Sequence, residues 1–89
     1  MGKASQALRS ELIRAARALL RWEQRDLANA SSVSLPTIKR LESKPGIMLA
    51  HLSTTAALKK ALEAAGVEFI DENGGGPGVR LCKRQKKKD

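Results

Sequence analysis

The 89-residue sequence is poor in aromatic side chains, cysteine and histidine. It contains one tryptophan, one phenylalanine and no tyrosine, with Cys82 as the single cysteine and His51 as the single histidine. Proteins that bind single-stranded nucleic acid stack the bases on several aromatic rings, so this scarcity argues against that class. One cysteine cannot form an intramolecular disulfide, and together with one histidine it offers too few ligands for a zinc site. We therefore expect neither a metal ion nor another cofactor.

Long apolar runs and groups with catalytic potential are also missing. No apolar stretch approaches the roughly 18 residues of a membrane span, and the first residues contain no hydrophobic signal region, so we expect a cytoplasmic protein. His51 stands alone and Cys82 falls in an expected strand, so nothing combines a nucleophile, a base and an orienting group. The GGGPG run lacks the strand-to-helix context of a nucleotide-binding loop. The chain is not expected to be an enzyme.

Basic side chains are abundant. Lys and Arg number 17 against 9 Asp and Glu, which gives a formal net charge of +8. An excess of this size is typical of nucleic-acid-binding proteins. Residues 80–89 contain six basic and one acidic residue, so they carry +5 and the rest of the chain only +3. We expect residues 83–89 to be a disordered basic tail that attracts phosphates without reading sequence.

Apolar residues that recur every three or four positions predict four helices. The first spans about residues 6–21, and its apolar stripe is Leu8, Leu12, Ala15, Ala16, Leu19 and Leu20. The second spans about 24–30, and the third runs from 35 or 36 to about 43 with Ser34 as its N-cap. Ser53 is expected to cap a fourth helix over 54–65, and Leu49 and Leu52 are expected in the core.

After Gly66 the apolar period changes to two. Val67 and Phe69 precede the turn sequence DENGGGPG, and Val79 and Leu81 follow it, which predicts a β-hairpin. A lone two-stranded hairpin is marginally stable, so this one is expected to pack on the helices. Its open edge can pair with the same edge of a second chain, which makes these four apolar residues the dimerisation candidates. The apolar connection 47–52 is the other candidate surface for a dimer.

Several short sequences within residues 9–65 resemble the Cro/CI-type, phage-repressor-like helix-turn-helix regulators, also called the XRE family. The matching elements are IRAARALL, Gln24, Asp26-Leu27-Ala28, Ser32-Val33-Ser34 and Thr37-Ile38-Lys39-Arg40-Leu41-Glu42. The ending VEFIDENGGGPGVRL resembles that of small bacterial members in which a hairpin follows the helices. The resemblance implies a mainly α fold: a four-helix helix-turn-helix domain at 1–66, a β-hairpin at 67–82 and the tail at 83–89.

Two positions depart from the family pattern. Ser32 stands where the family often has glycine, so a positive φ angle there would strain the backbone. Leu35 and Pro36 stand where the family usually has hydrogen-bonding side chains that read bases. These two residues offer only apolar contact, which suits the methyl groups of thymine.

By this resemblance the chain is a sequence-specific regulator of transcription that binds double-stranded DNA as a homodimer on inverted repeats. The third helix would enter the major groove with Leu35, Pro36, Lys39 and Arg40 toward the bases, and Arg40 can donate to both O6 and N7 of guanine. Gln24, Ser34, Thr37 and Lys44 are expected to bind the phosphate backbone. Arg25 is either another phosphate-binding residue or an exposed charge. The resemblance also implies an ion pair between Arg17 and Glu42 that fixes the third helix.

Two other functions fit parts of the sequence. The chain can be an antitoxin or adaptor that binds a protein partner through Leu35, Pro36 and the run Ile47-Met48-Leu49. It can also be a basic protein that binds all duplexes equally. A mobility-shift assay beside a pull-down of protein partners distinguishes these alternatives.

Overall fold

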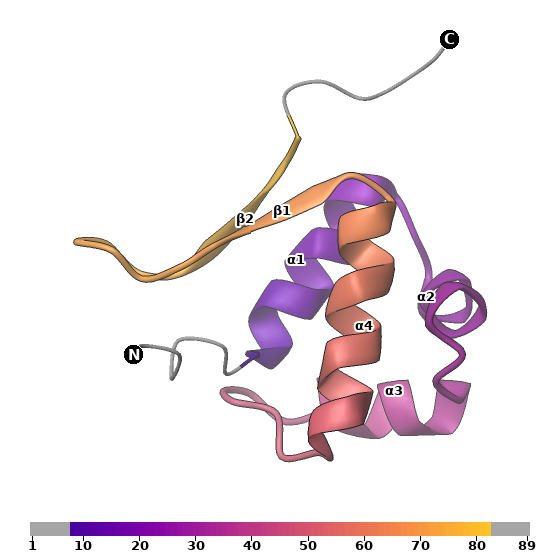
Figure 1. The fold of residues 1–89 in the computed structure, drawn as a ribbon. Coiled ribbons are helices and arrows are strands. Elements are labelled where there is room, and N and C mark those ends of the chain that lie inside the picture. Colours follow the sequence, from indigo (N-terminus) through magenta and orange to yellow (C-terminus); the bar gives the residue numbers. More distant parts are fainter. Residues whose placement is uncertain (1–7, 83–89) are drawn as a thin grey trace, which may run out of the picture.

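Four helices and a C-terminal hairpin make up the computed structural model, which describes residues 8–82 (Figure 1). Their bounds are α1 Ser10–Leu20, α2 Gln24–Ser31, α3 Leu35–Glu42, α4 Leu52–Ala64, β1 Val67–Ile70 and β2 Gly78–Leu81. α4 runs through the middle of the molecule, with α3 at its N-terminal end and the hairpin at its C-terminal end (Figure 1). The expected fold class is confirmed.

The core takes apolar side chains from all four helices and from β1. The largest fully buried apolar residues are Ile13, Leu27, Ile38, Leu58, Leu62 and Val67. Their burial removes apolar surface from water, which is the main source of stability in a domain of this size. The expected stripe of the first helix is right in part. Leu8 and Ala16 are buried and Leu20 packs against the core, whereas Ala15 and Leu19 are exposed. Ile13, which the stripe did not include, is fully buried.

The residues just before α1 pair with the loop that follows α3. Arg9, the extended N-cap of α1, forms an isolated antiparallel bridge with Ile47. The backbone N–H of Ser10 donates to the carbonyl of Gly46 and that of Met48 donates to the carbonyl of Leu8, both at 2.8 Å. Side chains alternate in such a pairing, so Leu8 and Met48 are buried while Ile47 is 54% exposed.

The expected burial of Leu49 and Leu52 was wrong. They are 85% and 82% exposed, and Met48 fills the core position instead. α4 begins at Leu52 with His51 as its N-cap, two residues before the start that Ser53 predicted. Leu52 does not lie on the face of α4 that carries the buried residues Leu58, Ala61 and Leu62, so its side chain points away from the core.

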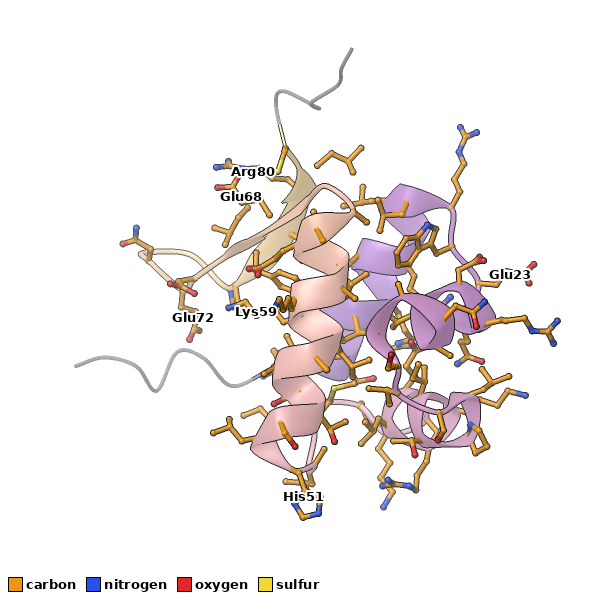
Figure 2. All side chains as sticks on the ribbon, turned by 45° about the vertical axis from the view of Figure 1, so that its right-hand side comes forward. Glu23, His51, Lys59, Glu68, Glu72 and Arg80 are labelled. Carbon is orange, nitrogen blue, oxygen red and sulfur yellow. The ribbon has the colours of Figure 1, made fainter. Side chains whose placement is uncertain are left out.

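The hairpin packs on the helices as expected. Its register pairs Val67 with Leu81 and Phe69 with Val79 on one face, and Glu68 with Arg80 on the other. The Arg80 guanidinium donates to both carboxylate oxygens of Glu68, at 3.1 and 3.2 Å, and this bond and charge lower the pKa of Glu68. The Lys59 ammonium of α4 lies 5.7 Å from the centroid of the Phe69 ring (Figure 2).

The turn between α2 and α3 fixes the start of α3. Ser32 adopts φ 64°, the left-handed conformation in which a Cβ atom is unfavourable. The Ser34 Oγ then accepts a hydrogen bond from the backbone N–H of Thr37 at 3.3 Å, which confirms the expected N-cap. Pro36 occupies the first turn, where backbone N–H groups have no helical partner, so it costs no hydrogen bond.

A buried ion pair fixes the end of α3. Arg17 of α1 donates from Nε to Glu42 Oε2 at 2.9 Å and from Nη2 to Oε1 at 2.6 Å. The side chains are 17% and 3% exposed, and the expected pair is confirmed. The Gln24 amide donates to Glu42 Oε1 at 3.0 Å, and Arg17 Nη1 donates to the Trp22 carbonyl at 3.0 Å. One carboxylate therefore joins α1, the start of α2 and the end of α3.

Replacing Ser32 by glycine should stabilise the fold. Relief of the left-handed strain of about 1 to 2 kcal/mol is partly offset by the extra chain entropy of glycine, which leaves a gain of roughly 0.5 to 1 kcal/mol. Urea denaturation followed by circular dichroism measures the change. Ser32→Ala keeps the Cβ atom and serves as the control that gains nothing; a loss of stability in Ser32→Gly would contradict the strain.

Glu42→Ala should destabilise the fold by about 3 kcal/mol, because it leaves the mostly buried Arg17 guanidinium without its counter-charge. The melting temperature by circular dichroism reports this loss. Glu63→Ala removes an exposed glutamate of α4 and should change stability by less than about 0.5 kcal/mol. Equal melting temperatures of the two variants would show that the ion pair does not hold α3.

Candidate nucleic-acid interface

The outward side of α3 brings together most of the residues that the sequence assigned to base contacts. Ile38, Leu41 and Glu42 face the core, and the opposite side of the helix carries Pro36, Lys39 and Arg40, all exposed. Leu35 and Thr37 are half-buried at the edge of this side, and Lys44 is exposed just beyond the helix. These residues form one continuous strip along α3, which we call the α3 strip: Leu35, Pro36, Thr37, Lys39, Arg40 and Lys44.

The exposed charge on α3 and the loop that follows it is entirely positive. Residues 33–51 contain three basic residues, Lys39, Arg40 and Lys44, and a single acidic one. That acidic residue, Glu42, is 7% exposed and its charge is compensated by Arg17. A segment whose exposed charges are all positive attracts polyanions.

Two hydroxyl groups lie at the start of the α3 strip. Ser34 Oγ donates to Thr37 Oγ1 at 2.8 Å and accepts the bond from Thr37 N, so the cap uses this hydroxyl. Thr37 Oγ1 accepts that bond and keeps its own proton for a further acceptor. Of the two hydroxyls, Thr37 is therefore the one free to donate to a phosphate or a base.

The start of α2 contributes less to the candidate phosphate contacts than the sequence suggested. Gln24 is half-buried, and its amide group donates one hydrogen bond to Glu42, which leaves one N–H for another acceptor. Arg25 is exposed, but so is Glu23 (Figure 2), whose backbone N–H donates to the Asp26 carboxylate at 2.8 Å. The two carboxylates at this end of α2 reduce its attraction for a phosphate.

A hollow adjoins the α3 strip at the N-terminal end of α4. Its volume is about 400 Å³, and its lining residues are Thr37, Arg40, Leu49, Ala50, His51 and Thr54. His51 points away from the body of the protein at this end of α4 (Figure 2). His51 and Thr54 were not among the residues predicted for the site, because cap preferences made Ser53 the N-cap of the last helix.

The loop between α3 and α4 is held in place by α1. Both carboxylate oxygens of Glu11 accept from the backbone N–H of Gly46, at 3.1 and 3.2 Å. Bonding to the Glu11 backbone N–H lowers the pKa of this carboxyl, burial opposes the shift, and the Gly46 N–H and the charges of Arg9 and Arg14 lower it further. Gly46 itself has φ 92°, a conformation that L side chains rarely adopt. The position of the hollow is therefore fixed relative to the core.

The expected dimerisation residues lie mostly in the core of their own chain. Val67 is 1% exposed, and Phe69 and Val79 are half-buried against the same core. Leu81 alone is 43% exposed. The alternation of the strands indicated an apolar face correctly, and this face packs on the helices. Pairing of the open hairpin edge with a second chain stays a prediction.

Within residues 8–82 the structure shows no group of three or more His, Cys, Asp and Glu side chains able to hold a metal ion. None of the helices of this part of the chain has the length and apolar character needed to cross a bilayer. Residues 83–89, expected to form the basic tail, lie outside the described part of the chain.

No protein-family model matches the chain, and no curated protein is significantly similar to it. What bears on its function is the geometry and charge of α2, α3 and the loop that follows them.

Proposed function

We propose that this chain is a cytoplasmic transcriptional regulator of the Cro/CI type that binds double-stranded DNA sequence-specifically, with α3 in the major groove. The observation that carries the proposal is the α3 strip, where every exposed charge is positive and the one carboxylate is turned inward against Arg17. A helix presented in this way fits the major groove, whose width admits one helix and whose base edges carry a unique pattern of donors and acceptors.

The residues of the α3 strip take different roles in this proposal. Arg40 is exposed near the middle of the strip, and its planar guanidinium can donate to O6 and N7 of one guanine. Pro36 and Leu35 present apolar surface to thymine methyl groups. Lys44, Thr37 and Lys39 donate to phosphates or to neighbouring bases, and Gln24 and Arg25 add weaker backbone contacts.

One copy of α3 reads a short sequence. Its eight residues span about 12 Å, which corresponds to a few base pairs. Specific binding in a genome needs more contacts than that, so we propose a homodimer on an inverted repeat with half-sites about 34 Å apart. The described part of the chain measures 38 × 33 × 20 Å, so two copies can occupy adjacent turns on one side of the DNA.

Selection of bound sequences from a random duplex pool by the full chain tests the proposal, followed by mobility-shift titration of the selected site. Arg40→Ala should lose about 1 to 3 kcal/mol of discrimination between that site and a variant with one G·C pair replaced, since a bidentate contact is worth this much. Arg40→Lys keeps the charge without the bidentate geometry, so it should lose discrimination and keep nonspecific affinity. Arg14→Ala, an exposed arginine of α1, is the matched control.

Equal affinity of the unmodified chain for all duplexes would overturn the proposal in favour of a nonspecific DNA-binding protein. Retention of full discrimination by Arg40→Ala would show that the α3 strip does not read the bases.

A further inference from the structure

The hollow at the N-terminal end of α4 is continuous with the α3 strip, because two of its lining residues belong to that strip. We call it the His51 hollow, and its lining residues are Thr37, Arg40, Leu49, Ala50, His51 and Thr54. Its volume of about 400 Å³ is within the roughly 300 to 1,000 Å³ of typical ligand sites, which leaves room for a sugar and its phosphate.

The lining of the His51 hollow combines the chemical groups that bind a DNA backbone. Arg40 carries a permanent positive charge, and Thr37 and Thr54 have hydroxyl groups that can donate to phosphate oxygens. Leu49, which is 85% exposed, offers an apolar surface to a deoxyribose ring. Phosphate and sugar alternate along a DNA strand, so one strand can contact both kinds of surface.

The hollow lies beside a DNA strand when α3 occupies the major groove. A helix with its side chains is about 10 to 12 Å across and the groove is about 12 Å wide, so the protein surface next to the helix meets the sugar-phosphate strands. α3 lies at the N-terminal end of α4, and His51 points away from the body of the protein at that same end (Figures 1 and 2).

We infer that the His51 hollow seats a backbone phosphate of the bound DNA and that His51 makes this contact proton-dependent. The inference rests on the proposed function and adds to it a regulation by pH. A neutral imidazole donates one hydrogen bond without a charge, whereas the protonated ring donates two and is positive. Histidine side chains ordinarily change between these forms at about pH 5 to 8, so the contact should strengthen as the pH falls through this range.

Within residues 8–82, the elements around His51 contribute cations and two carboxylates that are already engaged. The cations are Arg40 of α3 and Lys44 of the following loop, and the first turn of α4 contains no acidic residue. Glu42 of α3 is buried, and Glu11 of α1 accepts hydrogen bonds from the loop backbone. A phosphate is therefore the anion that a protonated His51 can bind at this end of the protein.

The test measures the affinity of the full chain for its selected DNA site between about pH 5.5 and pH 7.0. Ordinary carboxyl groups stay charged and α-amino groups stay protonated in this range, so the single histidine is the group that titrates. His51→Gln cannot take up a proton, and His51→Lys is charged throughout. Lys60→Gln removes an exposed charge from the second half of α4 and is the control. The His51 side chain makes no capping hydrogen bond, so its variants should fold normally, as circular dichroism checks.

The affinity of the unmodified chain and of Lys60→Gln should rise by about three- to fivefold from about pH 7.0 to about pH 5.5, which is the effect of an exposed ion pair. His51→Gln should show no rise, and His51→Lys should keep the higher affinity at both pH values. At the lower pH the slope of log affinity against log salt concentration should steepen by up to about 0.9 in the unmodified chain and not in His51→Gln, because one more phosphate is neutralised.

Nuclear magnetic resonance of the unmodified chain reports the contact directly, because its one histidine gives unambiguous ring signals. At about pH 6.5 these signals should move toward the positions of the protonated ring when duplex DNA is added. Inorganic phosphate at the same concentration should move them less, since it lacks the contacts that α3 makes with the rest of the duplex.

An affinity independent of pH, a rise that persists in His51→Gln, or weaker binding by His51→Lys would each overturn the inference. Ring signals that do not respond to the duplex would also overturn it, and an equal response to inorganic phosphate would assign the hollow to free anions instead. If the chain bound all duplexes equally, the proposed function would fail, and the same pH series on any duplex would still decide whether His51 binds a phosphate. Binding to no duplex would exclude both.

Discussion

The ion pair between Arg17 and Glu42 is the interaction on which the candidate interface depends. It orients α3 against α1, and it removes from the surface the only negative charge between residues 33 and 51. Burying two charges is costly, and a pair of apolar side chains could give similar stability. An apolar pair could not make the two further hydrogen bonds of the ion pair. Glu42 accepts one from the Gln24 amide, and Arg17 donates the other to the Trp22 carbonyl. The pair therefore contributes more to the orientation of α3 than to the free energy of folding.

Much of the fold follows from local sequence rules. The N-cap at Ser34, the turn at Ser32 and the change of apolar period after Gly66 each depend on neighbouring residues, and each predicted its element correctly. The ion pair joins residues 25 positions apart, and only the family resemblance located it. The strip of base-contact candidates on α3 followed from the same resemblance together with helical periodicity.

The predictions that failed concern contacts between distant parts of the chain. Pairing of residues 8–10 with 46–48 depends on backbone hydrogen bonds that any sequence can make, so composition gave no sign of it. That pairing shortened the first helix, turned Met48 inward and left Leu49 exposed. Likewise, the apolar face of the hairpin was visible in the sequence, but whether helices or a second chain covers it depends on tertiary packing.

The same pairing joins the start of α1 and the loop between α3 and α4 into one rigid unit. Leu8 and Ser10 hold the loop by its backbone, and Glu11 holds it again at Gly46. The loop cannot move away without breaking these bonds, so its opening and the fraying of the first turn of α1 occur as a single event. The rigidity of the loop beside the α3 strip is thus supplied by residues that lie almost 40 positions earlier in the chain.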